Sequence, residues 1–251
     1  MTRYKLTLEY DGTNTVGWQI QNGHGSDKYL SIQQLLTDAV FRFCGQQVAV
    51  VAAGRTDAGV HALGMAAHFD LTGDARHADT VKNALNFWLQ DAGAPVAVLG
   101  AEIVPDDWHA RFSCVRRNYR YVIVNRGAPT VLDKNRAWWV PRPLDVAAMQ
   151  AAAAQLIGKH DFTSFRASEC QARSPVKTLD ELRIKKEELR IIIEVSAKSF
   201  LHHQVRNMVG TLVAIGLGRP YSIPEILAAH SRSAAGPNAP AHGLYFTSAE
   251  Y

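Results

Sequence analysis

The sequence predicts an α+β fold of two ferredoxin-like β-α-β-β-α-β units, which form an extended, mainly antiparallel sheet with helices on one face. Two observations support this prediction. Segments in which apolar and polar side chains alternate are interspersed with segments in which apolar residues recur at helical spacing. The same order of elements occurs in residues 1–104 and again in residues 105–251, as a repeat of element order and not of sequence.

The first unit is expected to contain four strands and two helices. The strands are indicated by alternation or by short apolar runs, and they are expected over Tyr4–Tyr10, Val48–Ala53, Leu63–Leu71 and Pro95–Ile103. Ser31 is expected to cap the first helix and Gly45 to end it. Asp79 is expected to cap the second helix. The two middle strands then form a hairpin with a long loop, which is typical of a functional connection.

The second unit follows a crossing segment over residues 104–116. Its strands are expected over Arg117–Asn125, Thr178–Lys185, Leu189–Ala197 and Leu244–Ser248. One helix is expected over Leu144–Ile157, ended by Gly158, and another over His203–Leu217. The alanine-, proline- and glycine-rich insert over residues 222–243 is expected to form a short helix and an ordered loop.

Composition excludes several classes of protein. With 47% apolar and 20% charged residues, the chain resembles soluble globular proteins. Its N-terminus alternates polar and apolar residues instead of forming the apolar block of a signal peptide, and no apolar run approaches the ~20 residues that span a bilayer. Three widely spaced cysteines do not form a C-x-x-C pair. We therefore expect a cytoplasmic protein with reduced thiols and no membrane association.

The net charge of +4 is unevenly distributed. Residues 1–104 carry 7 basic and 10 acidic side chains and the remainder carry 20 and 13, so the two parts have net charges of −3 and +7. A group of basic residues lies close together in the second part: Arg116, Arg117, Arg120, Arg126, Lys134, Arg136 and Arg142. This excess is suited to a polyanionic partner such as a nucleic acid, although a soluble protein with a basic surface is an equal alternative.

The stretch A-A-G-R-T-D-A-G-V-H-A, over residues 52–62, concentrates reactive groups in one predicted loop. It places the single carboxylate of Asp57 beside Arg55, between Gly54 and Gly59. Glycines allow the backbone to turn tightly or to approach another group closely. Taken alone, such a stretch favours an ordinary loop in which Asp57 binds its own backbone and Arg55 is solvated.

Two further residues, Tyr119 and Arg206, are candidates for a site. Tyr119 and Tyr121 share one face of their predicted strand, and Tyr119 lies between arginines that would favour stacking of an unpaired base. Tyr121 is expected to lie in the core. Arg206 begins a mostly apolar helix, where it requires a carboxylate partner unless it points to solvent. Asp57 is the candidate partner.

Metal and cofactor chemistry lack support in the sequence. The histidines form no H-x-x-x-H pair and no cysteine lies at ligand spacing. The glycines around Arg55 lack the ending of a phosphate-binding loop, and no nucleophile elbow is recognisable. These patterns indicate neither a metal site nor a phosphate-binding loop.

Eight motifs together resemble the tRNA pseudouridine synthase A family. In chain order they are Y-D-G ending at Gly12, G-W-Q from Gly17, G-R-T-D-A-G-V-H-A from Gly54, D-D-W-H-A-R-F-S from Asp106, R-N-Y-R-Y from Arg117, D-F-T-S-F-R from Asp161, H-H-Q-V-R-N-M-V-G from His202 and G-L-Y-F from Gly243. They span nearly the whole chain. The resemblance is less close over residues 22–30, where the loop is longer than usual, and over residues 87–93, which lack the usual N-x-x-L-P pattern.

The resemblance implies a homodimer that isomerises uridine to pseudouridine in the anticodon stem-loop of tRNAs, at positions 38 to 40, without cofactor or metal. One tRNA would contact both subunits. By motif, Asp57 corresponds to the catalytic aspartate, Tyr119 to the tyrosine that stacks on the uracil and Arg206 to the arginine paired with the aspartate. Arg55 corresponds to the arginine that extrudes the target base, and Leu244 to an apolar residue that lines the pocket.

This reaction is compatible with the residue types. It breaks the C1′–N1 bond, turns the uracil and joins C1′ to C5, so the base must first leave the stack. A carboxylate is a suitable anionic catalyst, whether it attacks C1′, adds to uracil C6 or acts at C2′ through a glycal. A non-catalytic RNA-binding protein and a hydrolase of phosphate or sugar bonds are the alternatives. The first has no use for a carboxylate paired to an arginine, and the second normally needs a metal or a second carboxylate.

Overall fold

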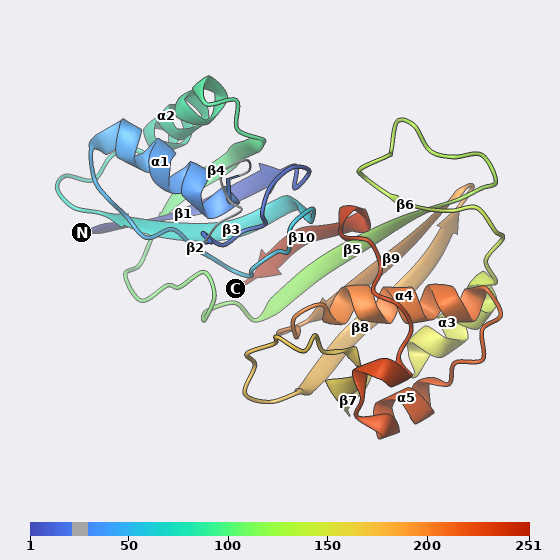
Figure 1. Cartoon of the computed structure of the whole chain (residues 1–251). Helices are drawn as coiled ribbons and strands as arrows, with labels where there is room; N and C mark the ends of the chain where they lie inside the picture. The colour runs from blue at the N-terminus through green and yellow to red at the C-terminus, as the bar shows by residue number, and fades with distance from the viewer. Residues whose placement is uncertain (22–29) are drawn as a thin grey trace. The chain divides into compact units, whose positions relative to one another are not determined.

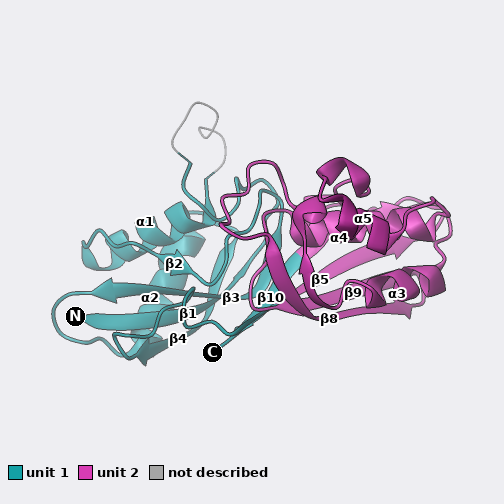
Figure 2. Ribbon diagram, turned by 90° about the horizontal axis from the view of Figure 1, so that it is seen from below, with its two compact units in different colours: residues 1–117, 245–251 teal, residues 118–244 magenta. Residues whose placement is uncertain are grey.

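The computed structural model of the chain describes residues 1–21 and 30–251, and the predicted long loop over residues 22–30 lies almost entirely outside this part. The described residues form two compact units, coloured separately in Figure 2. Unit 1 comprises residues 1–117 and 245–251, and unit 2 comprises residues 118–244. The sequence placed the boundary between residues 104 and 105. The following segment belongs to unit 1 because Arg3 donates to the Trp108 carbonyl and His68 accepts from the Ala110 N–H.

Unit 1 contains a mainly antiparallel sheet. Its strands are β1 (Thr2–Tyr10), β2 (Val51–Ala52), β3 (His61–Leu71) and β4 (Val96–Val104). Strand β1 lies between β3 and β4 and is antiparallel to both, and β2 pairs with β3 at the edge. The last strand, β10 (Leu244–Glu250, of which Leu244 belongs to unit 2), is parallel to β3, with Tyr245 opposite His61. The predicted strand over residues 48–53 is therefore shorter than expected, since only two of its residues pair with β3.

The helices of unit 1, α1 (Ile32–Cys44) and α2 (Ala78–Asp91), cover one face of this sheet (Figure 1). The predicted ends of α1 are confirmed: the Ser31 side chain accepts from the Gln34 N–H, and Gly45 has a φ of 72° at the C-terminus. The predicted cap of α2 was wrong. The His77 ring accepts from the Asp79 N–H, while the Asp79 carboxylate lies in the first turn and binds Lys82.

The core of unit 1 lies between the helices and the sheet. As the alternation of β1 predicts, Tyr4, Leu6, Leu8 and Tyr10 are all buried. The Tyr4 ring stacks on Phe69 of β3, with 5.6 Å between the ring centroids. Removing one such large side chain from water contributes about 1.5 to 3 kcal/mol. This packing holds β3, the strand that follows the Asp57 loop, against β1.

The strands of unit 2 are mainly antiparallel and follow the order β5-β9-β8-β7, with β6 parallel to β5. They are β5 (Arg116–Asn125, of which residues 116–117 belong to unit 1), β6 (Trp138–Val140), β7 (Gly158–Asp161), β8 (Val176–Glu187) and β9 (Arg190–Ala197). The sequence did not predict β6 or β7, because three or four residues carry too little pattern. Gly158 is the first residue of β7, opposite Leu179 of β8.

Three helices, α3 (Val146–Ala154), α4 (Gln204–Gly216) and α5 (Ile223–Ala229), belong to the described part of unit 2. Helix α3 is shorter than predicted, since Asp145 caps it and Gln155 already binds the Ala152 carbonyl three residues back. Helix α4 carries the predicted apolar stripe. It is buried on almost all sides, because Asn207 and Thr211 on its other faces are buried as well.

The predicted fold class is confirmed: the chain is an α+β protein whose sheet is mixed and mostly antiparallel. The insert over residues 222–243 forms α5 and two short 3-10 turns, as predicted. All three cysteines are free. Within the described ranges, every helix is too short or too polar to cross a bilayer.

Candidate active site

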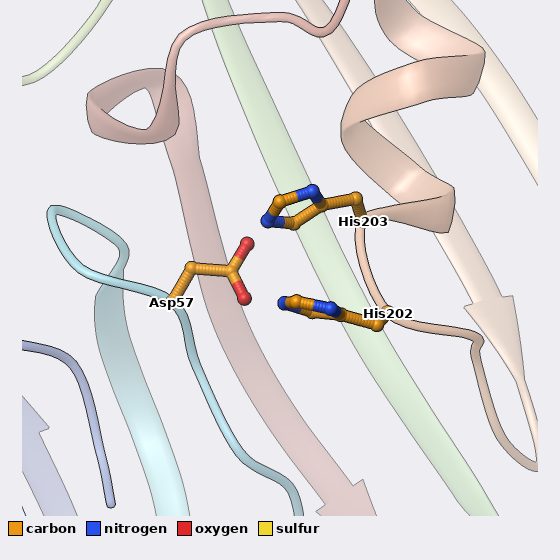
Figure 3. Close-up of side chains that lie close together, drawn as sticks. All are labelled: Asp57, His202 and His203. Atoms are coloured by element: carbon orange, nitrogen blue, oxygen red, sulfur yellow. The ribbon is translucent and has the colours of Figure 1, made fainter. Parts of the chain in front are cut away.

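Asp57 lies on the loop that connects β2 to β3 in unit 1 (Figure 3). The backbone of this loop packs directly against the segment that follows β1. A Cβ atom on Gly12 would lie 2.1 Å from the Val60 carbonyl oxygen, and one on Gly17, whose φ is 89°, would lie 2.5 Å from the Thr56 carbonyl oxygen. Only glycine permits these approaches. The position of Asp57 is thus fixed by backbone contacts.

Hydrogen bonds reinforce this position. The Trp18 N–H donates to the Thr56 carbonyl at 3.0 Å, and the Thr56 hydroxyl lies 2.8 Å from the Tyr10 hydroxyl in the core. The Val60 N–H donates to the Asp57 carbonyl at 3.1 Å and closes the turn. The Asp57 side chain is half-buried and Arg55 is exposed. The loop therefore combines a rigid backbone with a carboxylate that is accessible at its surface.

His61 has a structural environment. It is buried at the start of β3, its Nδ1 accepts from the Gly12 N–H at 3.0 Å, and its ring stacks on Tyr245 with 4.8 Å between centroids. These contacts attach the C-terminal end of the Asp57 loop to the segment that follows β1 and to β10.

Arg117 is a site residue that the sequence analysis missed. This side chain is only 8% exposed, and its Nε and Nη2 atoms donate to the Ala53 carbonyl at 2.9 and 2.7 Å. Nη2 also donates to the Arg111 carbonyl at 2.7 Å. Arg117 was counted as part of a basic surface. The alternation of β5 could have predicted that Arg117 is buried, because Arg117 shares the face of this strand that buries Tyr121.

Tyr119 and Tyr121 of β5 differ in environment although they share a face. Tyr119 is half-buried and meets Phe200 edge-on, with 5.2 Å between ring centroids. Tyr121 is fully buried and its hydroxyl donates to the Pro240 carbonyl at 2.7 Å, which confirms the prediction that it belongs to the core. Burial raises the pKa of Tyr121 well above its usual range. Its hydroxyl is therefore neutral.

Arg206 lies in the first turn of α4. His202 and His203, labelled in Figure 3, come just before this helix. The Arg206 Nε donates to the Ala239 carbonyl at 2.8 Å, and the side chain is half-buried. His203 has a φ of 62°, which turns the chain sharply into the helix. The predicted pairing of Arg206 with Asp57 joins residues of different units and stays a prediction.

Leu244 is buried at the start of β10. The residues before it connect the two elements that carry Tyr119 and Arg206. Arg206 binds the Ala239 carbonyl, and a Cβ on Gly243 would lie 2.6 Å from the Tyr121 ring. Within unit 2, the segment over residues 239–243 therefore holds β5 and the start of α4 together.

The basic group predicted from the sequence is only partly on the surface. Besides the buried Arg117, Arg120 is engaged in an ion pair with Glu194 at 3.3 Å. A Lys185 hydrogen bond lowers the pKa of Glu194, so the carboxylate is charged. The exposed members are Arg126, Lys134, Arg136 and Arg142. The exposed cations of this group are thus concentrated around the connection from β5 to α3.

A cavity of about 300 Å³ lies in unit 2 between β6 and the C-terminal half of α4. Trp138, Val213, Leu217 and Tyr221 are among the residues that line it. None of the predicted site residues is among those that line it within the described ranges. The predicted site is therefore not identified by this cavity.

Comparison with known proteins supports the resemblance found in the sequence. The family model described as tRNA pseudouridine synthase matches residues 7–113 and 152–251. The chain is 54% identical to tRNA pseudouridine synthase A of Paramagnetospirillum magneticum over 255 residues, which covers 100% of this chain and 96% of that protein. It is 56% identical to the protein of the same name from Rhodospirillum centenum, with 100% of both chains covered. A third such protein, from Rhodospirillum rubrum, is 54% identical over 98% of this chain and 86% of its own length. The chain belongs to the tRNA pseudouridine synthase family and is an isomerase that forms pseudouridine in tRNA.

Proposed function

We propose that this enzyme isomerises uridine to pseudouridine in the anticodon stem-loop of tRNAs, at positions 38 to 40, with Asp57 as its catalytic residue. The observation that carries the proposal is the rigid attachment of the Asp57 loop through Gly12 and Gly17, which presents one half-buried carboxylate. Fixed positioning of a reactive group supplies a large part of enzymatic rate enhancement.

The reaction balances without any co-reactant. The C1′–N1 bond breaks, the C1′–C5 bond forms, C5 loses a proton and N1 gains one. The reaction neither gains nor loses electrons, so it needs no oxidant or reductant. Asp57 acts at C1′, at uracil C6 or at C2′; in each of these routes an ionised carboxylate at the flipped nucleotide is required.

The other predicted residues have separate tasks in this proposal. Arg55 is exposed, which suits a side chain that enters the RNA stem and displaces the target base. Tyr119 stacks on the extruded uracil, and Leu244 supplies apolar lining. Arg206 pairs with Asp57 and favours its ionised form.

The proposal includes a homodimer in which one tRNA contacts both subunits, acting in the cytoplasm. It also gives the two parts predicted from the sequence different roles. Residues 1–104 carry the catalytic loop, and residues 105–251 supply Tyr119, Arg206 and the larger share of basic side chains. The exposed cations around the connection from β5 to α3 support binding of a polyanion.

The substitution Asp57→Asn tests the catalytic assignment. The amide has the size of the carboxylate but no negative charge, so tritium release from 5-tritiated uridine in tRNA should fall by roughly 10³-fold or more. Binding of tRNA, measured by filter retention, should change little. The exposed Asp74→Asn is the matched control and should retain wild-type turnover.

Substantial turnover by Asp57→Asn would refute the role of Asp57. The position of the product is tested separately, by mapping pseudouridine in unmodified tRNA after incubation with the wild-type enzyme. Product outside the anticodon stem-loop would refute that part of the proposal.

A further inference from the structure

Unit 1 exposes a large aromatic side chain on the turn that follows β4. Phe112 is 77% exposed, and one side of its ring lies against the His109 ring, with 4.4 Å between centroids and 33° between planes. The guanidinium of Arg111, also exposed, lies 5.8 Å from the centroid of the Phe112 ring. An aromatic surface next to a cation is suited to an unpaired base and its phosphate.

The backbone of this turn is fastened by side chains from other elements. The Trp108, Ala110 and Arg111 carbonyls accept hydrogen bonds of 2.7 to 2.8 Å, and their donors are Arg3, Tyr251 and Arg117. The Ala110 N–H donates to His68. This backbone is therefore already ordered in the folded protein. A ligand that binds here does not have to order it, which favours binding.

The same turn is connected to the Asp57 loop through Arg117. One guanidinium donates both to the Arg111 carbonyl and to the Ala53 carbonyl, four residues before Asp57. Phe112 and Asp57 both belong to unit 1. A nucleotide held by Phe112 is thus positioned relative to the catalytic loop by a short chain of hydrogen bonds.

We propose that Phe112 is a stacking platform for an unpaired base of the tRNA other than the target uridine, and that Arg111 binds a phosphate beside this base. The proposal rests on tRNA as the substrate, and it assigns a second contact outside the reacting nucleotide. A phenyl ring has no hydrogen-bonding group, so the platform accepts any base. The adjacent positive charge favours a nucleic acid over an apolar protein surface.

The substitution Phe112→Ala tests the platform. It should weaken tRNA binding and raise KM by about tenfold, because stacking is lost, while kcat changes by less than about twofold. Phe112→Trp should restore affinity. Phe87→Ala is the matched control, since Phe87 is 61% exposed and also contacts a neighbouring ring on its own element, at 5.0 Å from Trp88.

The substitution Arg111→Ala tests the phosphate contact. It should weaken binding and reduce the slope of log Kd against log salt by about one unit, while the slope for Phe112→Ala stays unchanged. Melting temperatures of both variants should remain those of the wild type, since the side chains are exposed.

The proposal is overturned if Phe112→Ala binds tRNA as tightly as the wild type, or if tryptophan fails to restore affinity. It is also overturned if sedimentation at the assay concentration shows that Phe112→Ala has lost a subunit contact, because a second copy then occupies the ring. These outcomes are independent of Asp57→Asn, whose loss of turnover at unchanged affinity tests the catalytic assignment alone.

Discussion

The Asp57 loop of unit 1 and the first half of α4 in unit 2 carry predicted site residues and are positioned in different ways. The loop is held by close backbone packing against Gly12 and Gly17, and by hydrogen bonds to Thr56. Helix α4 is held by burial on almost all faces and by close packing of Gly210 against Pro237, where a Cβ would lie 1.7 Å from the carbonyl oxygen.

Because of this difference, we expect substitutions near the loop and substitutions inside α4 to affect different properties of the enzyme. A change next to the loop moves a half-exposed carboxylate and disturbs little of the core, so its main effect should be on catalysis. A change inside α4 disturbs the core of unit 2, so its main effect should be on folding. Each substitution below tests one side of this comparison.

The largest effect on stability is expected for Gly210→Ala. Helix propensity alone would favour alanine by about 1 kcal/mol, but the contact with Pro237 requires the backbone to move. We expect a net loss of about 3 to 4 kcal/mol in the free energy of unfolding, measured with urea. In Gly216→Ala, the matched control, the new methyl group meets the flexible Met149 side chain, and the loss should be about 1 kcal/mol or less.

The Asp57 loop should respond most strongly to Gly17→Ala. The methyl group would collide with the Thr56 carbonyl at a φ of 89°, and it would displace the catalytic loop. We expect a loss of about 2 kcal/mol in stability and a decrease in kcat of about 10²-fold. Gly45→Ala has a similar φ of 72° and nothing within 4 Å, so it should lose about 1 kcal/mol and keep its kcat. Equal kcat values for both variants would contradict the positioning argument.

Acid should weaken unit 1 through His68, which is 4% exposed and accepts from the Ala110 N–H. Burial, followed by the charge of Arg3, lowers the pKa of His68 to about 4. The unfolded chain takes up this proton near pH 6.5 and the folded chain only near pH 4, so stability falls as the pH drops through this window. The expected loss is about 2 kcal/mol between pH 7 and pH 5.

His68→Asn provides the control for this pH dependence. Its Oδ1 atom can accept from the Ala110 N–H without titrating. The free energy of unfolding of the variant, measured with urea, should therefore not show the decrease at low pH that is assigned to His68. If the variant and the wild type have the same pH profile, another group is responsible.

The smallest effects are expected for the two tyrosines of β5. Tyr119→Phe keeps the stacking ring, so we expect an unchanged KM and a several-fold lower kcat, consistent with one lost hydrogen bond of about 1 kcal/mol. Tyr121→Phe leaves the Pro240 carbonyl without its donor and should reduce stability by about 1 to 2 kcal/mol at unchanged kcat. The reverse pattern would exchange the roles assigned to the two residues.

Local signals made much of the fold predictable. Ser31 and Gly45 gave the ends of α1, and alternation gave the buried face of β1, because both depend on residues close in sequence. The cap of α2 was mispredicted, since His77 and Asp79 can both accept an N–H and the Asp79 carboxylate is engaged by Lys82. The short strands β6 and β7 exist only through pairing with distant strands.

The sequence by itself determined the fold class, the family and the loop on which Asp57 lies, because these depend on periodicity and on motifs that are contiguous in the chain. Only the tertiary structure placed β10 beside β3, buried Arg117 against Ala53 and left Phe112 exposed on a fastened turn. These features depend on contacts between residues tens or hundreds of positions apart. A local pattern does not contain them, since the same arginine or phenylalanine can be buried or exposed according to what packs against it.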